Sequence, residues 1–222
     1  MRVRALPLLL LLACAGIPAN RYGLSVVPDL ATYEGLARAT PGKRLTDLGA
    51  LGVTLDIRYA TANNFIKKPL YRKAKAWLRA PAARALQEVR RELAGKGLDI
   101  KVFDAYRPYR VTEMMWEPIR NPDYVADPAK GSRHNRGAAV DLTLIDLATG
   151  SELPMPTGYD DFTERAAHAF ADVPADVRHN RELLRDVMVR HGFQALPSEW
   201  WHYDFAGWER FELMDVAFDE LE

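Results

Sequence analysis

Two stretches of the chain repeat apolar residues at helical spacing, and a glycine follows each of them. The first spans residues 81–96, starts with a proline suited to a first helical turn, and precedes Gly97. The second spans residues 180–191 and precedes Gly192. Each pattern places its apolar side chains on one face, which predicts an amphipathic helix packed against a core. A shorter helix is predicted over residues 111–119, with its two methionines and its tryptophan in the core.

Alternation of apolar and polar residues predicts strands elsewhere in the chain. Residues 138–147 alternate most regularly and place Asp141 on the polar face of the predicted strand. Residues 98–103, which follow the first predicted helix, are also expected to form a strand, and residues 51–59 alternate in part. Residues 121–130 contain two prolines and predict a loop, which could border or cover a pocket.

Length and charge narrow the class of protein. The chain has 222 residues, of which 30 are basic and 30 acidic, so its formal net charge is zero. Without a start that resembles an export signal, roughly 200 residues remain, enough for one domain with a substantial core. The sequence contains no run or stripe of basic residues, so nucleic acid is not an expected partner.

The first residues resemble a bacterial export signal. Residues 1–14 have a basic beginning and a short apolar run, too short to span a bilayer. Cys14 is the only cysteine of the protein and follows Leu-Leu-Ala, which is similar to a bacterial lipoprotein cleavage box. We expect a lipid anchor at Cys14; the alternative is ordinary cleavage near Ala15 or Ala19 with no lipid attached. Both alternatives imply an exported protein of the bacterial periplasm or cell envelope.

Proline and glycine suggest how the chain is divided. We assign residues 1–19 to the signal, residues 20–44 to a tether or lead-in, and residues 45–222 to one folded domain. Residues 206–222 are amphipathic and end in acidic residues, which indicates a terminal packing segment.

Two separate stretches supply the residues of a candidate metal site. The stretch Ser132–Asp141 contains His134 and Asp141, and the stretch Glu199–His202 ends in a second histidine. Two neutral imidazoles and one carboxylate are a ligand set that catalytic zinc favours, with a fourth position left for water. Considered separately, His134 could be a buried histidine with satisfied hydrogen bonds, and Asp141 a cap or ion-pair partner. Together with His202 they predict one Zn²⁺ ion per chain.

Glu199 lies three residues before a predicted ligand, where a general base is needed. Side chains alternate along a strand, so Glu199 and His202 would point to opposite faces if both were in it. We therefore place Glu199 in a turn and His202 at the start of the strand. Trp200 and Trp201 are expected to form walls of the pocket and to raise the pKa of Glu199 by excluding water.

The pattern Ser-x-His-x-x-Gly-x-Ala-x-Asp followed by Glu-x-Trp-His resembles the signature of zinc D-alanyl-D-alanine peptidases. Stretches at residues 56–65, 104–108 and 141–155 narrow the resemblance to VanX-type D-alanyl-D-alanine dipeptidases. The motifs occur in the family's order, and the similarity covers roughly residues 45–205. The resemblance implies a single α+β domain of the hedgehog-like fold, in which helices flank a mixed or antiparallel sheet.

The resemblance also implies an activity, the zinc-dependent hydrolysis of D-alanyl-D-alanine, and roles for several residues. Arg107 would stabilise the oxyanion of the tetrahedral intermediate, and Asp104 could orient its guanidinium. The alternative for Arg107 is a solvated surface arginine. Physiologically, such an enzyme would act in the turnover of cell-wall dipeptide or in resistance to glycopeptide antibiotics.

Three residues are candidates for binding a small dipeptide. By resemblance Tyr59 forms a pocket wall, although it could equally be a core aromatic of a strand. Ser132 would donate a hydrogen bond to the terminal carboxylate, or it caps a turn. Asp160 would bind the α-ammonium group, and its neighbour Asp161 is the alternative. Tyr71 could line the pocket as well.

Two other functions remain open at this stage. A D,D- or L,D-carboxypeptidase or endopeptidase would use the same zinc chemistry on peptidoglycan stem peptides. Such an enzyme needs an open groove, whereas a dipeptidase needs a closed pocket that matches both charged termini. A binding module that keeps the metal without hydrolysis would be expected to lack the base or the arginine, and this chain has both Glu199 and Arg107.

Overall fold

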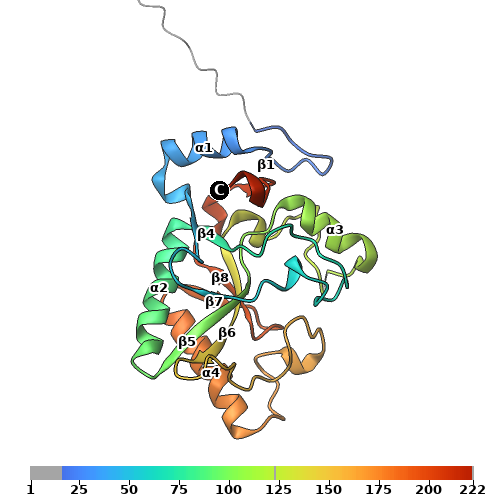
Figure 1. Ribbon diagram of the computed structural model, residues 1–222. Coiled ribbons are helices and arrows are strands. Elements are labelled where there is room, and N and C mark those ends of the chain that lie inside the picture. Colours follow the sequence, from blue (N-terminus) through green and yellow to red (C-terminus); the bar gives the residue numbers. More distant parts are fainter. Residues whose placement is uncertain (1–16, 123, 222) are drawn as a thin grey trace, which may run out of the picture.

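The computed structural model describes residues 17–122 and 124–221 (Figure 1). Within these residues a five-stranded sheet has the order β3-β5-β6-β8-β7. Its strands are β3 (Thr54–Leu55), β5 (Leu98–Asp104), β6 (Ala139–Asp146), β7 (Phe193–Ala195) and β8 (His202–Phe205). All neighbours pair antiparallel except β3 and β5, which are parallel. The sheet is therefore mixed.

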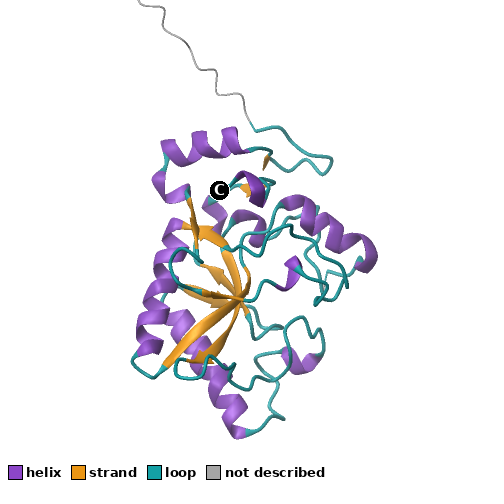
Figure 2. Ribbon diagram, in the orientation of Figure 1, coloured by secondary structure: helices purple, strands orange, loops and turns teal. Residues whose placement is uncertain are grey.

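Helices cover the sheet unequally. Figure 2 shows α2 (Ala80–Ala94) and α4 (Ala175–Arg190) on one side, and α3 (Tyr109–Ile119) with long loops on the other. This arrangement confirms the predicted α+β class. It also leaves the loop-covered side free to build a pocket, because loops can bring together side chains from distant parts of the chain.

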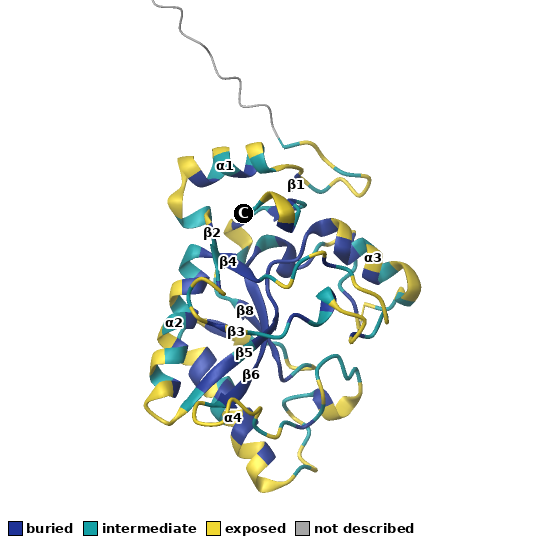
Figure 3. Cartoon of the chain, in the orientation of Figure 1, coloured by how far each residue is buried: buried dark blue, intermediate teal, exposed yellow. Residues whose placement is uncertain are grey.

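The core lies between the sheet and the two helices. Fully buried apolar side chains of α2, α4, β5 and β6 form one cluster, which includes Leu86, Val89, Leu93, Ile100, Val102, Leu142, Leu144, Leu184, Val187 and Met188. Each such side chain contributes roughly 1.5–3 kcal/mol through its removal from water. Strand β6 is buried on both faces (Figure 3), so its polar residue Asp141 is buried as well.

The predicted helices are confirmed with shifted ends. Helix α2 matches the predicted span closely, whereas α4 begins five residues earlier than predicted, directly after Pro174 at the N-cap. In α3 the core prediction is wrong for Met114, which is 48% exposed, while Met115 is buried.

The strand predicted over residues 51–59 is wrong for most of its length. Only Thr54–Leu55 pairs with the sheet, and Arg58–Ala60 forms a 3₁₀ turn. The carbonyl oxygen of Tyr59 accepts hydrogen bonds from the amides of Leu70 and Tyr71 at 2.7 and 2.9 Å. These bonds join the loop that contains Leu70 and Tyr71 to the backbone of Tyr59. Tyr59 therefore lies outside the sheet, although its side chain is buried.

Residues 20–44 are more than a tether. Strand β1 (Val26–Val27) pairs in parallel with β9 (Leu213–Met214), and α1 (Leu30–Ala39) follows it. The Tyr33 hydroxyl of α1 accepts a hydrogen bond from the amide of Leu45 at 2.6 Å. Leu45 starts β2 (Leu45–Asp47), which pairs antiparallel with β4 (Trp77–Arg79). Residues 20–44, the expected lead-in, therefore contact β9 near the C-terminal end of the domain and β2 at its start.

The signal-like stretch and Cys14 fall among residues 1–16, outside the described residues. In the part of the chain that the structure describes, none of the helices has the length and apolar character needed to cross a bilayer.

Candidate metal centre and active site

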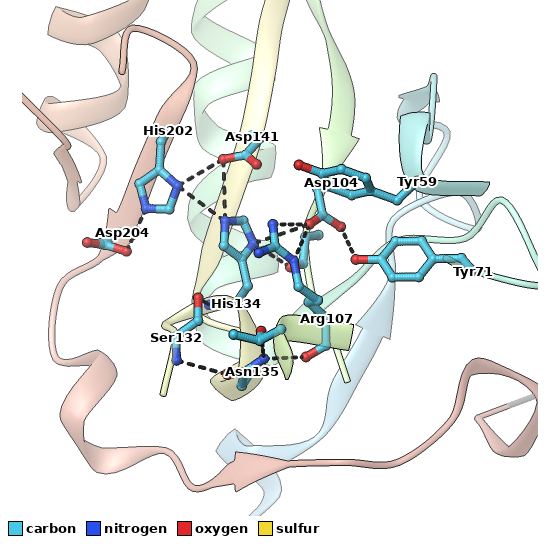
Figure 4. A network of polar contacts seen from close by, with 12 residues as sticks. Tyr59, Tyr71, Asp104, Arg107, Ser132, His134, Asn135, Asp141, His202 and Asp204 are labelled. Carbon is cyan, nitrogen blue, oxygen red and sulfur yellow. Dashed lines mark hydrogen bonds and ion pairs between the residues drawn. The ribbon is translucent and has the colours of Figure 1, made fainter. Parts of the chain in front are cut away.

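The three predicted metal ligands meet at the centre of the sheet. Asp141 on β6 and His202 on β8 are direct cross-strand partners, and His134 lies in a 3₁₀ turn (His134–Arg136) that leads into β6. His202 Nδ1 lies 2.9 Å from Asp141 Oδ1 and 3.2 Å from His134 Nε2 (Figure 4). His134 Nε2 is 3.4 Å from the same carboxylate oxygen. One ion could therefore contact all three atoms.

Each ligand also makes a hydrogen bond on the side that faces away from the other two ligands. His134 Nδ1 lies 2.7 Å from the carbonyl oxygen of Ala105, and His202 Nε2 lies 3.0 Å from Asp204 Oδ1. In neutral imidazoles these nitrogens donate, which leaves the facing nitrogens with free lone pairs. The second oxygen of Asp141 accepts a hydrogen bond from the Tyr159 hydroxyl at 2.9 Å. Supporting groups of this kind orient ligands for a metal ion.

The electrostatics of the three residues also suit a cation. Burial opposes ionisation of Asp141, but His134 and His202 hold the pKa of its carboxyl well below the usual range. Burial likewise opposes a charge on His202, yet hydrogen bonds to Asp141 and Asp204 raise the pKa of its imidazole well above the ordinary value. A bound divalent cation would supply the positive charge that protons supply otherwise. Two nitrogens and one oxygen at these distances fit such an ion.

Gly137 makes the connection between His134 and β6. Its φ of +65° is in the left-handed region, and a Cβ atom there would lie 2.7 Å from Leu45 Cδ2. Ser132 stabilises the start of the same turn, because its Oγ accepts a hydrogen bond from the His134 amide at 3.2 Å. Ser132 therefore caps the turn, which is one of the two roles considered for it, and it also lines the pocket.

Arg107 is held rigidly beside the metal ligands. Its Nε and Nη2 donate to Asp104 Oδ2 at 3.0 and 2.7 Å, and the Tyr71 hydroxyl donates to the other oxygen at 2.8 Å. The guanidinium also lies 5.3 Å from the centre of the Tyr59 ring. Burial acts against the charge of Arg107, but the Asp104 carboxylate raises its pKa well above the ordinary value. Arg107 is a buried, permanent cation and not a solvated surface residue.

Asn135 was not predicted from the sequence, although it lies inside the signature. It is fully buried, and its Nδ2 donates to the carbonyl oxygen of Arg107 at 3.0 Å and to Thr112 Oγ1 at 2.8 Å. The Arg107 amide in turn donates to the carbonyl oxygen of His134 at 3.1 Å. These bonds join the arginine backbone to the metal-binding turn.

The predicted metal ligands, catalytic residues and three main substrate-binding candidates line one cavity of about 440 Å³. The three metal ligands share it with Arg107, Glu199, Ser132, Tyr59 and Asp160. Glu199 lies in the turn before β8, as predicted, and its burial raises the pKa of its carboxyl group. Trp201 lines the cavity, as predicted. The same prediction is wrong for Trp200, which is buried outside the cavity lining and donates a hydrogen bond to Thr157 Oγ1 at 2.9 Å.

The predicted loop borders the cavity, whereas two of the substrate-binding candidates lie outside its lining. Pro122, Tyr124, Val125 and Ala126 of the predicted loop border the cavity, which confirms one of the two roles considered for that loop. Tyr71 does not belong to the lining residues; it contacts Asp104 behind the arginine. Asp161 also lies outside the lining, and its carboxylate accepts a hydrogen bond from the Thr163 amide at 3.0 Å.

Asp160 has an unusual environment for a carboxyl group. Oδ1 accepts a hydrogen bond from the Tyr59 hydroxyl at 2.9 Å, whereas the buried Oδ2 has no hydrogen-bond partner among the described residues. Burial raises the pKa of Asp160 to about 8. The residue also has a left-handed φ of +61°. A buried carboxylate with a free oxygen in a cavity is suited to a cationic group of a ligand.

Comparison with known proteins places the chain in a family. A family model described as D-Ala-D-Ala dipeptidase, of the M15 peptidases, matches residues 45–217. The chain belongs to this family. D-alanyl-D-alanine dipeptidase of Escherichia coli (strain K12) is 36% identical over 162 residues, which cover 72% of this chain and 83% of that protein. D-alanyl-D-alanine dipeptidase of Enterococcus faecium is 34% identical over 175 residues, which cover 68% and 85%.

Membership in the D-Ala-D-Ala dipeptidase family confirms the fold expected from the resemblance. Two residues that hold the metal ligands in place, Asp204 and Tyr159, were not predicted from the sequence. Asp204 could have been found, because a carboxylate two positions after His202 in a strand lies on the same face. Tyr159 carries no such signal, since its contact with Asp141 depends on a loop that returns to β6.

Proposed function

We propose that the protein hydrolyses D-alanyl-D-alanine to two molecules of D-alanine, with one Zn²⁺ ion held by His134, Asp141 and His202. The observation that carries this proposal is a single cavity that combines the three metal-binding residues with Glu199 and Arg107. The relatives named D-alanyl-D-alanine dipeptidases support the choice of substrate.

The nitrogen and oxygen donors of the three ligands favour zinc. When bound there, zinc would act as a Lewis acid that polarises the peptide carbonyl and lowers the pKa of the attacking water. To hold the ion, the imidazole nitrogens and the carboxylate oxygen that face the site must be free of protons. Hydrogen bonds from the outer imidazole nitrogens to Ala105 and Asp204, and from Tyr159 to Asp141, orient these facing atoms toward the site.

Glu199 is suited to move a proton twice. As a carboxylate it accepts a proton from the attacking water, and as a carboxylic acid it then donates that proton to the leaving amine. Its raised pKa makes the second transfer easier than it would be for a solvated glutamate. Glu199 lines the same cavity as the ligands, so its carboxyl group borders the space in which the substrate would bind.

Arg107 would stabilise the negative charge that develops on the carbonyl oxygen. Asp104 fixes its guanidinium before the substrate arrives, so little reorganisation is needed during the reaction. The loss of one such donor typically raises a reaction barrier by about 2.7–4 kcal/mol.

The two ends of the dipeptide have complementary partners in the cavity. The free oxygen of Asp160 is suited to accept a hydrogen bond from the α-ammonium group. Ser132 Oγ accepts from the His134 amide and keeps its hydroxyl hydrogen, which can be donated to the terminal carboxylate. Tyr59 positions Asp160 and forms part of the wall.

A decisive experiment compares D-alanyl-D-alanine with its N-acetyl derivative. A dipeptidase should hydrolyse only the free dipeptide, since acetylation removes the charge that Asp160 binds. Activity should disappear with a chelator and fall by orders of magnitude in Glu199→Ala. Preferential hydrolysis of the N-acetyl substrate would favour the alternative, a D,D- or L,D-carboxypeptidase or endopeptidase that cuts peptidoglycan stem peptides.

We also propose that the protein is exported to the bacterial periplasm or cell envelope and anchored through an acylated Cys14. The basic and apolar start and the Leu-Leu-Ala-Cys sequence support this proposal. There the enzyme would act on dipeptide released during cell-wall turnover or would contribute to glycopeptide resistance. Fractionation of cells that produce the protein or Cys14→Ser tests the anchor, because only the unchanged protein should remain with the membrane.

A further inference from the structure

Aromatic side chains from three loops meet in the wall of the cavity. Phe162 contacts Phe65 edge-on with ring centres 5.2 Å apart, and it stacks on Tyr124 at 5.3 Å. Phe65 in turn contacts the Tyr59 ring edge-on at 6.1 Å. All four rings line the same cavity. Phe65 and Phe162 are half-buried, and Tyr124 is 44% exposed at the border.

This aromatic wall lies next to the carboxylate assigned to the ammonium group. Tyr59 donates a hydrogen bond to Asp160 and contacts Phe65 with its ring, and Phe162 follows Asp160 by two residues. The α-ammonium group and the side chain of an N-terminal residue are attached to the same carbon atom. A dipeptide bound through Asp160 therefore has its first side chain, and not its second, closest to these rings.

The cavity is larger than two alanine residues require. Its volume of about 440 Å³ lies in the range of roughly 300–1,000 Å³ found for pockets that enclose drug-sized ligands. Alanyl-alanine is far smaller than such ligands, and its methyl groups offer little surface to four aromatic rings. A larger apolar side chain would fill this space and displace water from the rings.

We infer that Phe65, Phe162 and Tyr124 form a subsite for an apolar N-terminal side chain larger than methyl. The enzyme then accepts D-dipeptides such as D-leucyl-D-alanine. This inference rests on the proposed function, in which Asp160 binds the ammonium group, and it extends that function to a wider class of substrates.

The test uses two isomeric substrates, D-leucyl-D-alanine and D-alanyl-D-leucine, beside D-alanyl-D-alanine. They contain the same atoms and differ only in the position of the large side chain. With the zinc-loaded full chain, kcat/KM for D-leucyl-D-alanine should equal or exceed that for D-alanyl-D-alanine. Phe162→Ala should lower the ratio of kcat/KM for D-leucyl-D-alanine to kcat/KM for each of the other two substrates by about tenfold or more.

Two further variants separate the subsite from a general effect on folding. Phe162→Leu keeps an apolar side chain and should show a smaller loss in the same direction. Phe170→Ala removes a half-buried phenylalanine that lies outside the cavity lining, and it should leave the ratio between the substrates unchanged.

The possible results are distinguishable. Hydrolysis of D-alanyl-D-alanine without hydrolysis of D-leucyl-D-alanine overturns this inference and leaves the proposed function intact. The inference is also overturned if both Phe162 variants reduce kcat/KM equally for all three substrates. Failure of the unchanged, zinc-loaded protein to hydrolyse D-alanyl-D-alanine overturns the proposed function and the subsite with it.

Discussion

Arg107 and Asp104 form a buried ion pair in which one carboxylate oxygen accepts both hydrogen bonds of the guanidinium, at 3.0 and 2.7 Å. The other oxygen is occupied by the Tyr71 hydroxyl. Both oxygens of Asp104 thus accept hydrogen bonds, which fixes the direction of the guanidinium. Arg107 lines the cavity and Asp104 does not, so the effect of Asp104 on the reaction is to position Arg107.

Removal of Asp104 should therefore affect both stability and activity. Asp104→Ala leaves the cation of Arg107 buried without its partner and should lower the free energy of unfolding by about 3–5 kcal/mol. Tyr71→Phe removes a single hydrogen bond and should lower it by about 1 kcal/mol, with a smaller fall in kcat. Thermal unfolding and steady-state kinetics measure both effects. An unchanged kcat in Asp104→Ala would contradict the positioning role.

Replacement of Glu199 should separate catalysis from metal binding. Glu199→Ala should lower kcat by about 10²–10⁴-fold, the usual contribution of a general acid–base group. Its metal content, measured by atomic absorption, should stay at one ion per chain because Glu199 is not one of the three ligands. Glu164→Ala, at an exposed position, is the matched control and should retain activity. Activity close to normal in Glu199→Ala would remove the proposed base.

Metal affinity should depend on a residue that does not contact the ion. Asp204→Asn weakens the hydrogen bond to His202 Nε2 and should lower metal affinity by about 10–100-fold. A chelator should remove the ion from this variant at lower concentration than from the unchanged protein, with loss of activity and a lower Tm. His179→Ala, an exposed histidine outside the site, should behave like the unchanged protein.

Asp160 should make the metal-free protein less stable as the pH rises. Its pKa is about 8 in the folded protein and near 3.8 in the unfolded chain, so the folded state holds the proton more tightly. Stability is then lost progressively between about pH 4 and pH 8, by at most about 1.4 kcal/mol per pH unit. Asp160→Asn removes this loss.

The difference in Tm between Asp160→Asn and the unchanged protein should therefore grow over that pH interval and level off above pH 8. The effect should be smaller with metal bound, because a nearby cation favours the carboxylate. The same variant should raise KM for the free dipeptide. A Tm difference independent of pH would show that Asp160 is ionised throughout.

The sequence predicts best what depends on local spacing. The helices α2 and α4 and the strands β5 and β6 were found because their apolar residues repeat over many positions. His134, Asp141 and His202 were found because a ligand set has a chemistry of its own, whatever the fold. The prediction for residues 51–59 failed because two residues of strand offer too short a pattern, and the loop at Leu70–Tyr71 determines the path of the backbone.

The supporting groups were harder to predict. Asn135, Tyr159 and the contact of Tyr71 with Asp104 depend on which loops meet after folding, and an isolated polar residue in a loop is usually solvated. Asp160 could be separated from Asp161 only when the structure placed one carboxylate in the cavity and used the other to cap a turn.

The cross-strand pairing of Asp141 with His202 has a consequence for how the protein assembles. A slip of one position between β6 and β8 would turn one of the two ligands to the opposite side of the sheet. The ion can therefore bind tightly only after these strands have found their correct alignment, and the uptake of a spectroscopically visible substitute such as Co²⁺ would follow the completion of the central sheet during refolding.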